Sequence, residues 1–581
     1  MDETLAGPGD SRLDQRLARL TQTQRALLER RLQDEPASGH DLVARTLAGL
    51  GVTHVYGVPG QPVYDTFAAC GRESIRLIGT HHQHPAALMA GAHNYFAGQQ
   101  KAASIVSAGT PTANALSAVV VAHDNCWPLV VLAGAAPQTA SGAGYFMALD
   151  GARLYQPVTK WATRVPETHA IPTCIAEAFE VAMDGRPGPV LVELPEDVLT
   201  GLTVGTGTPQ AASTAQTGLE PDPAVLKNVA TALISAKRPL LIVGKGVRWA
   251  SPFAQLRELV DALALPFITS PIGRGAIADN HLLCMNAIQW IAQSQADLVL
   301  LVGARLDWTF RYGRQLASET TVIQVDVHAP EFGRNRQIDL GVHADAGCFL
   351  RALLVEIDQA QRSQAQSCRD HTWLVALRQL RHEVQAKREA QARNDGSPIS
   401  PLRLAREIRD ALPGDAISIF DSNLTMAACQ RMIPVQVPVS RLTPGTSGCM
   451  GVGIPYAIAA KLARPERPVV AICGDFAFGL SVMELETAVR HNVPIVIVIA
   501  NNDGNGGSLR QRMHMSNVAT EPIMMFQSGL RYDKIASVLG GFAEHVEYAR
   551  DIGPALTRAI ASNRPACISI AVDQDAPFPA D

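Results

Sequence analysis

The chain contains 581 residues, 47% of them hydrophobic, and carries a formal net charge of −4 at pH 7. A chain of this length should form about three to four domains, and its small charge gives no reason to expect nucleic acid or an anionic membrane as a partner. It has no apolar run of the roughly 20 residues needed to cross a bilayer, no signal-peptide pattern in its start MDETLAGPGD, and ten cysteines without paired spacing, so we expect a soluble cytoplasmic protein.

Residues 1–36 are predicted to form a charged helical extension. The segment SRLDQRLARLTQTQRALLERRLQDE places leucines at helical spacing, and Thr21 followed by Gln24 matches a capping box. One interpretation is a solvated surface appendage. The other is a docking element, because TQTQRALLERRL resembles short helices that flank modules in nonribosomal peptide and polyketide synthases. Such a synthase would then be a partner.

Residues 37–205 alternate helix-like and strand-like pieces, which predicts a first α/β domain. Its apolar runs HVYGVPG, AASIVSAG, LVVLAGA and VLVELP are bounded by turn residues and are typical of a buried parallel sheet. The polar stretch that follows, TVGTGTPQAASTAQTGLEPDP, is predicted to be a linker.

Two further α/β domains are predicted over residues 222–365 and 399–581, with a charged helical linker at 366–398. The strands expected in the second domain are PLLIVGKG, PFITSP, LVLLVGARLDW and TVIQVDVHAP, and those of the third include DAISIFD, PVVAICGD and PIVIVIANN. The predicted fold class is therefore α/β, with three doubly wound parallel-sheet domains.

The segment 474–504 gives the clearest chemical signal. Asp475 ends one apolar run and Asn502 and Gly504 follow the next, so a strand–helix–strand unit would place them side by side at the carboxyl ends of two strands. A carboxylate, an amide oxygen and a backbone carbonyl are hard ligands suited to Mg²⁺, which bridges to phosphates. The turn at the helix start offers backbone N–H groups to the same phosphates; its residues are Gly474, Asp475, Phe476 and Ala477. This pattern resembles the diphosphate-binding motif of thiamine-diphosphate (ThDP) enzymes.

Longer segments narrow the resemblance to the oxalyl-CoA decarboxylases and 2-hydroxyacyl-CoA lyases, over roughly residues 38–575. These segments are GKGVRWA, PFITSPIGRGAIADNH, VGARLDW, VIQVDVHAPEFGRNRQ, NCWPLVVLAG and GLRYDKIASVLGG. The resemblance implies a pyrimidine-binding, a central and a diphosphate-binding domain, in that order. It also implies a homodimer or homotetramer, because each ThDP then lies between the first domain of one subunit and the third domain of another.

Two positions of this pattern concern the cofactor directly. In GTSGCMGVG, Met450 matches the apolar wedge that bends ThDP, and the Gly448 carbonyl would accept from the 4′-amino group; ordinary core packing is the alternative for Met450. In THHQHPAALMAGAHNYFAG, Gln83 stands where most relatives have a glutamate facing pyrimidine N1′, and a carboxamide can only hydrogen-bond there. The flanking His82 and His84 titrate near neutrality, so one could take over proton handling, or both could be packing residues.

Other positions near the reacting carbon also depart from the family pattern. Phe146 and Met147, in GAGYFMALD, align with a Tyr-Glu pair of the decarboxylases and make that wall apolar. After the double asparagine, Gly506 and Gly507 predict a mobile loop.

The central domain keeps more of the family's positions. An arginine and a lysine suit phosphates, and an aspartate suits a ribose hydroxyl, so these positions predict an ADP or CoA site. Structural salt bridges in a domain without a ligand are the alternative. The positions are Arg164, Gly244, Lys245, Arg305, Asp326 and Asp345.

The resemblance leaves three hypotheses open. The first is a ThDP- and Mg²⁺-dependent lyase, carboligase or decarboxylase that acts on a 2-oxo- or 2-hydroxyacyl thioester, bound to CoA or to a carrier protein, in specialised metabolism. The second is a free 2-oxo-acid carboligase resembling acetolactate synthase. The third is a catalytically weak ThDP-binding scaffold, which the altered pocket positions suggest.

Overall fold

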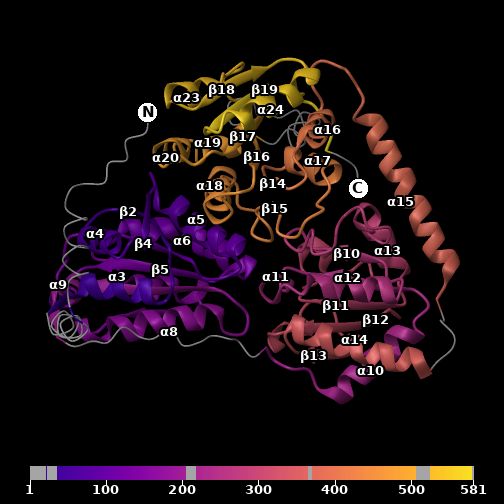
Figure 1. Ribbon diagram of the computed structural model, residues 1–581, viewed down its shortest axis with the longest axis horizontal. Helices are drawn as coiled ribbons and strands as arrows, with labels where there is room; N and C mark the ends of the chain where they lie inside the picture. The colour runs from indigo at the N-terminus through magenta and orange to yellow at the C-terminus, as the bar shows by residue number, and fades with distance from the viewer. Residues whose placement is uncertain (1–20, 22–35, 205–217, 364–368, 506–523, 579–581) are drawn as a thin grey trace.

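Three parallel sheets flanked by helices form the core of the protein, which we describe from a computed structural model (Figure 1). A short antiparallel pair, β1 (Ala37–Ser38) with β8 (Leu202–Thr203), accompanies them. The structure describes residue 21 and residues 36–204, 218–363, 369–505 and 524–578. The predicted docking helices, most of the first linker and the Gly506–Gly507 pair therefore lie outside the described residues. In the part that is described, no helix is both long and apolar enough to span a bilayer.

The first sheet has six strands in the order β3-β2-β4-β5-β7-β6, and every neighbouring pair is parallel. Its strands are β2 (His54–Val58), β3 (Arg76–Gly79), β4 (Ala102–Val106), β5 (Leu129–Ala135), β6 (Trp161–Arg164) and β7 (Pro189–Pro195). Its principal helices are α3 (Gly39–Gly49), α4 (Tyr64–Arg72), α5 (Gln83–Ala97), α6 (Thr110–Asn125) and α8 (Ile171–Met183). We call residues 37–204 the first unit.

The central sheet has five parallel strands in the order β10-β9-β11-β12-β13. Its strands are β9 (Pro239–Val243), β10 (Phe267–Thr269), β11 (Leu298–Val302), β12 (Thr321–Asp326) and β13 (Leu340–His343), and its longer helices are α10 (Pro223–Ser235), α12 (Phe253–Ala262) and α14 (Ala346–Ser363). We call residues 218–363 the central unit. The charged helix α15 (His371–Gln391) leaves it and runs along the outside of the molecule to the third sheet (Figure 1).

The third sheet has six parallel strands in the order β15-β14-β16-β17-β19-β18. Its strands are β14 (Ile417–Asp421), β15 (Arg441–Leu442), β16 (Val469–Gly474), β17 (Val496–Asn501), β18 (Phe542–Val546) and β19 (Ala566–Ala571). Its helices include α16 (Pro401–Ala411), α17 (Leu424–Met432), α18 (Gly453–Ala463), α19 (Asp475–Gly479), α20 (Glu484–Arg490), α23 (Asp533–Val538) and α24 (Ile552–Ala561). We call residues 399–578 the third unit. The three parallel sheets confirm the predicted fold class.

Helices α5 and α18 join the first and third units, and Figure 1 shows them side by side. Both helices are rich in buried alanine, which lets their backbones approach closely, and they share one hydrophobic cluster. Trp127 and Tyr456 meet in it with ring centroids 5.5 Å apart, and Arg464 donates to the Phe96 carbonyl at 3.1 Å. This contact fixes where the N-terminus of α5, and with it Gln83, lies relative to the third sheet.

Candidate cofactor site

The predicted metal ligands gather at the carboxyl edge of the third sheet. Strands β16 and β17 are adjacent and parallel, so Asp475 and Asn502, each directly after its strand, lie at the same edge. Asp475 is 2% exposed; its Oδ1 accepts from the Phe476 N–H at 2.8 Å and its Oδ2 from the Gly504 N–H at 2.9 Å. The carboxylate is thereby fixed against both strand ends.

The third ligand completes a cluster of acceptors. The terminal amide atom of Asn502 that faces this edge lies 3.0 Å from the Gly504 carbonyl oxygen and 3.1 Å from Asp475 Oδ1. The amide nitrogen fits this place, because it donates to both oxygens. Turning the amide over would present its oxygen instead, and a hard cation would then have three oxygen ligands. Burial also raises the pKa of Asp475 to about 6, an energetic cost that a bound cation would offset. The oxygen set therefore fits Mg²⁺.

Residues 443–452, which we call the cofactor loop, carry Gly448 and Met450. Gly448 is exposed in a left-handed conformation with φ +64°, and Met450 is half-buried. The loop's far end is held by Asp421, which the sequence analysis missed: its fully buried Oδ2 accepts from the Gly453 N–H at 2.7 Å. Burial raises the pKa of Asp421 to about 7.

Gln83 begins helix α5 and is 8% exposed. Its Oε1 accepts from Asn114 Nδ2 at 3.0 Å, a partner on α6 that sequence reasoning did not identify. Both side chains of this hydrogen bond are uncharged amides. The structure therefore places a neutral amide pair at the position where the family pattern expects a carboxylate.

The histidines around Gln83 have separate partners. His82 caps α5, because its Nδ1 accepts from the His84 N–H at 3.1 Å. His84 Nδ1 lies 2.7 Å from Ser117 Oγ, and burial lowers the pKa of His84 to about 4, so its ring is neutral near pH 7. His81 Nε2 lies 2.7 Å from Glu486 Oε2. A neutral His84 can still exchange a proton, but these contacts give each ring a local structural role.

Glu484, at the start of α20, links the third unit to the turn that carries Gln83. It is 2% exposed and accepts from the His81 N–H at 3.1 Å and from Thr487 Oγ1 at 2.8 Å. Burial raises its pKa. Nothing in the spacing of the sequence distinguishes this glutamate from the neighbouring Glu486, which is why it was not predicted.

Phe146 and Met147 lie in the loop after β5. Phe146 is 70% exposed, and Met147 has left-handed backbone with φ +58°. The Met147 backbone lies so close to Gly109 that a Cβ there would come within 2.9 Å of the Met147 Cα. The apolar wall is therefore pinned to the start of α6, with one aromatic ring directed to solvent.

Gln83 and the cofactor loop lie in different units of the chain. Among the described residues, no hydrogen bond connects Gln83 with the cofactor loop or with Asp475. Leu480, beside Gly451 of the cofactor loop, is 55% exposed and Met483, also in the third unit, is 45% exposed. Exposed apolar side chains beside the loop are typical of a surface that another chain covers.

A cavity of about 1120 Å³ lies between the first and central units. It contains four of the six predicted nucleotide residues, Lys245, Arg305, Asp326 and Asp345. Arg164 and Gly244 are not among its lining residues; Arg164 instead pairs with the buried Glu193 at 3.0 Å. Sequence reasoning also missed Arg186, which lines the cavity and pairs with Glu331 at 3.1 Å.

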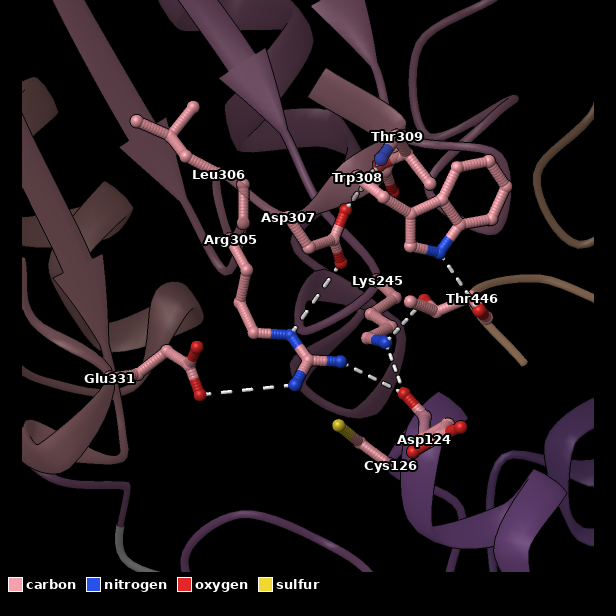
Figure 2. Close-up of polar contacts among 12 residues, drawn as sticks. Asp124, Cys126, Lys245, Arg305, Leu306, Asp307, Trp308, Thr309, Glu331 and Thr446 are labelled. Carbon is pink, nitrogen blue, oxygen red and sulfur yellow. Dashed lines mark hydrogen bonds and ion pairs between the residues drawn. The ribbon is translucent and has the colours of Figure 1, made fainter. Parts of the chain in front are cut away.

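The charged groups of this cavity are partly desolvated. Figure 2 shows Arg305 between Glu331 and Asp307, with its Nη2 donating to the Asp124 carbonyl at 2.9 Å. Burial lowers the pKa of Lys245 to about 8 and raises that of Asp326 to about 6. Asp345 accepts from the N–H groups of Gly347 and Cys348 and so caps α14. The cavity thus combines cations for phosphates with a carboxylate for a hydroxyl group, although several of these groups also pair with one another.

Comparison with known proteins gives three consecutive matches to family models. Residues 37–154, 226–353 and 422–570 match the N-terminal TPP binding domain, the central domain and the C-terminal TPP binding domain of thiamine pyrophosphate enzymes. The chain is 30% identical to a 2-hydroxyacyl-CoA lyase of Arabidopsis thaliana, covering 92% of this chain and 95% of the relative. It is 31% identical to an oxalyl-CoA decarboxylase of Escherichia coli strain K12 and to an acetolactate synthase large subunit of Mycobacterium tuberculosis, each covering 93% of this chain and 96% of the relative.

Proposed function

This chain belongs to the thiamine pyrophosphate enzyme family, and from that premise we propose that it uses ThDP and Mg²⁺ to break or form a carbon–carbon bond next to the carbonyl of a 2-oxo- or 2-hydroxyacyl thioester. The observation that carries the proposal is the convergence of the Asp475 carboxylate, the Gly504 carbonyl and the Asn502 side-chain amide at the edge of the third sheet. Bound ThDP supplies a nucleophilic carbon and an electron sink.

The chain's own residues bind and orient this cofactor. Asp475, Asn502 and the Gly504 carbonyl hold Mg²⁺, and backbone N–H groups of residues 474–477 face the diphosphate. With ThDP bound, the Gly448 carbonyl would accept from its 4′-amino group and Met450 would pack against it. Gln83 of a second chain would hydrogen-bond its pyrimidine N1′ without exchanging a proton. His82 and His84 are the neighbouring groups for proton handling, and Phe146 and Met147 form the wall beside the acyl group.

Two features support a thioester substrate and a homodimer or homotetramer. Relatives over nearly the full length include enzymes named for acyl-CoA substrates, and the cationic cavity suits the phosphates of CoA or ADP. The separation of Gln83 from the cofactor loop within one chain favours a site that two chains complete. A carrier-protein thioester, docked through residues 1–36, is the variant of this proposal in specialised metabolism.

The acetolactate synthase relative supports a second candidate, a carboligase of free 2-oxo acids. The two candidates differ in substrate, so purified protein with ThDP and Mg²⁺ should be offered a 2-hydroxyacyl-CoA, the same acyl group on a phosphopantetheine carrier protein, and pyruvate. Our proposal expects products from a thioester by mass spectrometry, and turnover of pyruvate alone would favour the second candidate. Cofactor binding without any turnover would favour the scaffold hypothesis.

Saturating ThDP with Mg²⁺ is expected to stabilise the protein by about 2.7 kcal/mol at a free ligand concentration of 100 times Kd, because the cofactor binds the folded state alone. Differential scanning calorimetry with and without the pair measures this effect. Adding EDTA should remove most of it, since the three oxygens then face the diphosphate without a bridging cation. An unchanged melting temperature with ThDP and Mg²⁺ would contradict both enzyme candidates.

Replacing Asp326 with asparagine is expected to weaken ADP binding about tenfold, because a carboxylate that accepts from a ribose hydroxyl forms a charge-assisted hydrogen bond. Isothermal titration calorimetry with ADP, and with CoA, measures the change. The exposed Glu319→Gln, which removes the same charge away from the cavity, should bind as the unaltered protein does. No measurable ADP or CoA binding to the unaltered protein would favour the salt-bridge interpretation of this cavity.

A further inference from the structure

Thr446, in the cofactor loop, is hydrogen-bonded through all three of its polar groups to residues outside the third unit. Figure 2 shows its contacts with Trp308 and Lys245. Its N–H donates to Asn125 Oδ1 at 3.0 Å, its carbonyl accepts from Trp308 Nε1 at 3.0 Å, and its hydroxyl accepts from Lys245 Nζ at 2.7 Å. Asn125 ends α6 of the first unit, whereas Lys245 and Trp308 follow β9 and β11 of the central unit.

The three partners are themselves held in place. Asn125 is 1% exposed and also donates to the Pro444 carbonyl at 3.1 Å. Lys245 also donates to the Asp124 carbonyl. Trp308 begins a short 3₁₀ turn that Asp307 caps, through the Thr309 N–H at 3.0 Å. Each partner therefore presents its polar group from a fixed position.

The cofactor loop needs such external anchors. Thr446 precedes Gly448 by two residues and Met450 by four. Glycine has the largest backbone freedom of any residue, and this loop contains three glycines with positive φ, so its own sequence specifies its shape weakly. At Gly445 the chain approaches both other units so closely that a Cβ would collide with Ile272 and with Asn125. At the far end of the loop, Asp421 accepts from the Gly453 N–H.

We propose that Trp308 and Lys245, in the central unit, are positioning residues for the cofactor site and act through Thr446. By holding Thr446, they fix the position of the cofactor loop and so of the Gly448 carbonyl and the Met450 side chain. The loop itself belongs to the third unit. This inference rests on the proposed function, because it assumes that the loop binds ThDP.

A substitution at Trp308 can distinguish a positioning role from ordinary packing. Its side chain is 52% exposed, so phenylalanine at this position keeps most of the ring contact and the fold while it removes the N–H that holds Thr446. Thr446→Val removes the hydroxyl at nearly constant shape, and Thr446→Ser restores it. Tyr312→Phe is the matched control: Tyr312 lies in the same segment, Trp308–Gly313, and is 44% exposed, and the hydroxyl that this change removes makes no bond to Thr446.

ThDP is titrated into the full chain and into each variant at saturating Mg²⁺, and its Kd is measured by calorimetry. The melting temperature of each protein is measured separately, without the cofactor. Trp308→Phe and Thr446→Val are expected to raise the ThDP Kd about tenfold, the loss of one well-placed hydrogen bond, with an unchanged melting temperature. Thr446→Ser and Tyr312→Phe should bind as the unaltered protein does.

Two results would overturn the inference. One is ThDP affinity equal to that of the unaltered protein in both Trp308→Phe and Thr446→Val. The other is a lower melting temperature before cofactor addition in proportion to the lost affinity, which would mark a packing role. If the unaltered protein itself does not bind ThDP, the proposed function fails first and the inference falls with it. ThDP binding by the unaltered protein therefore distinguishes failure of this inference from failure of the proposed function.

Discussion

Replacing Asp475 with alanine is expected to abolish the stabilisation by ThDP and Mg²⁺. The loss is about 2.7 kcal/mol at a free ThDP concentration of 100 times the Kd of the unaltered protein. Asp475 supplies the charged ligand of the oxygen cluster, and its Oδ2 also holds the Gly504 N–H, so the carbonyl ligand shifts with it. The metal site would keep one neutral amide oxygen, which is too little to retain a divalent cation. Calorimetric titration and thermal unfolding with the cofactor pair measure the result.

Asp573→Asn controls for the loss of one negative charge at the same end of the third sheet. Asp573 follows β19, the neighbour of β17; its N–H donates to the Ile399 carbonyl, and its Oδ1 accepts from the Asp575 N–H, a bond that an asparagine oxygen can keep. This variant should bind ThDP normally. Asp475→Ala that still gained stability from the cofactor pair would show that the phosphate-binding residues are elsewhere, and the site drawn at β16 and β17 would be wrong.

Gln83→Glu is expected to accelerate exchange of the C2 proton of bound ThDP by about 10²-fold or more, the usual range for acid–base assistance. The new carboxylate has room and a partner, because it can accept from Asn114 Nδ2 as Gln83 Oε1 does at 3.0 Å. Unlike the carboxamide it can exchange a proton with N1′. Exchange into D₂O, stopped with acid and read by NMR, measures the rate without requiring the natural substrate.

Gln83→Ala provides the comparison, since it removes the hydrogen bond to N1′ without adding a proton-exchanging group. Its exchange rate should be equal to or lower than that of the unaltered protein. If Gln83→Glu instead slowed exchange, the chemistry would depend on the carboxamide itself, and His84, which burial keeps neutral, would become the first group to substitute.

Sequence patterns predicted the buried strands of the fold and missed most of the sheet edges. Continuous apolar runs located β4, β5, β11, β16 and β17, all interior strands. The edge strands β3, β6, β13 and β18 were not predicted, because their partly exposed residues give no continuous apolar run. The buried interior strand β19 was also left unnamed, although its run ACISIA carries the signal.

The candidate site divides in the same way. The positions of Asp475 and Asn502 follow from local chain order, because two consecutive parallel strands must end at the same edge. Glu484 acts across two units, whereas Asn114 and Asp421 each contact an element of their own unit that is more than 30 residues away in the sequence. No spacing rule connects Glu484 with His81 or Asn114 with Gln83. Four of the six predicted nucleotide residues meet in one cavity, whereas Arg164 pairs with Glu193.

The hydrogen bonds that hold Thr446 limit whether the third unit of this enzyme can be exchanged independently of the other two. The proposed metal ligands Asp475, Asn502 and Gly504 come from one continuous unit, so a transplanted third unit would contain all of them. The donors and acceptor that hold Thr446 come from the two other units and would be left behind. A chimera that exchanges the third unit between relatives should therefore still bind the diphosphate of the cofactor. Its cofactor loop should be poorly positioned around the pyrimidine unless Asn125, Lys245 and Trp308 are transferred as well.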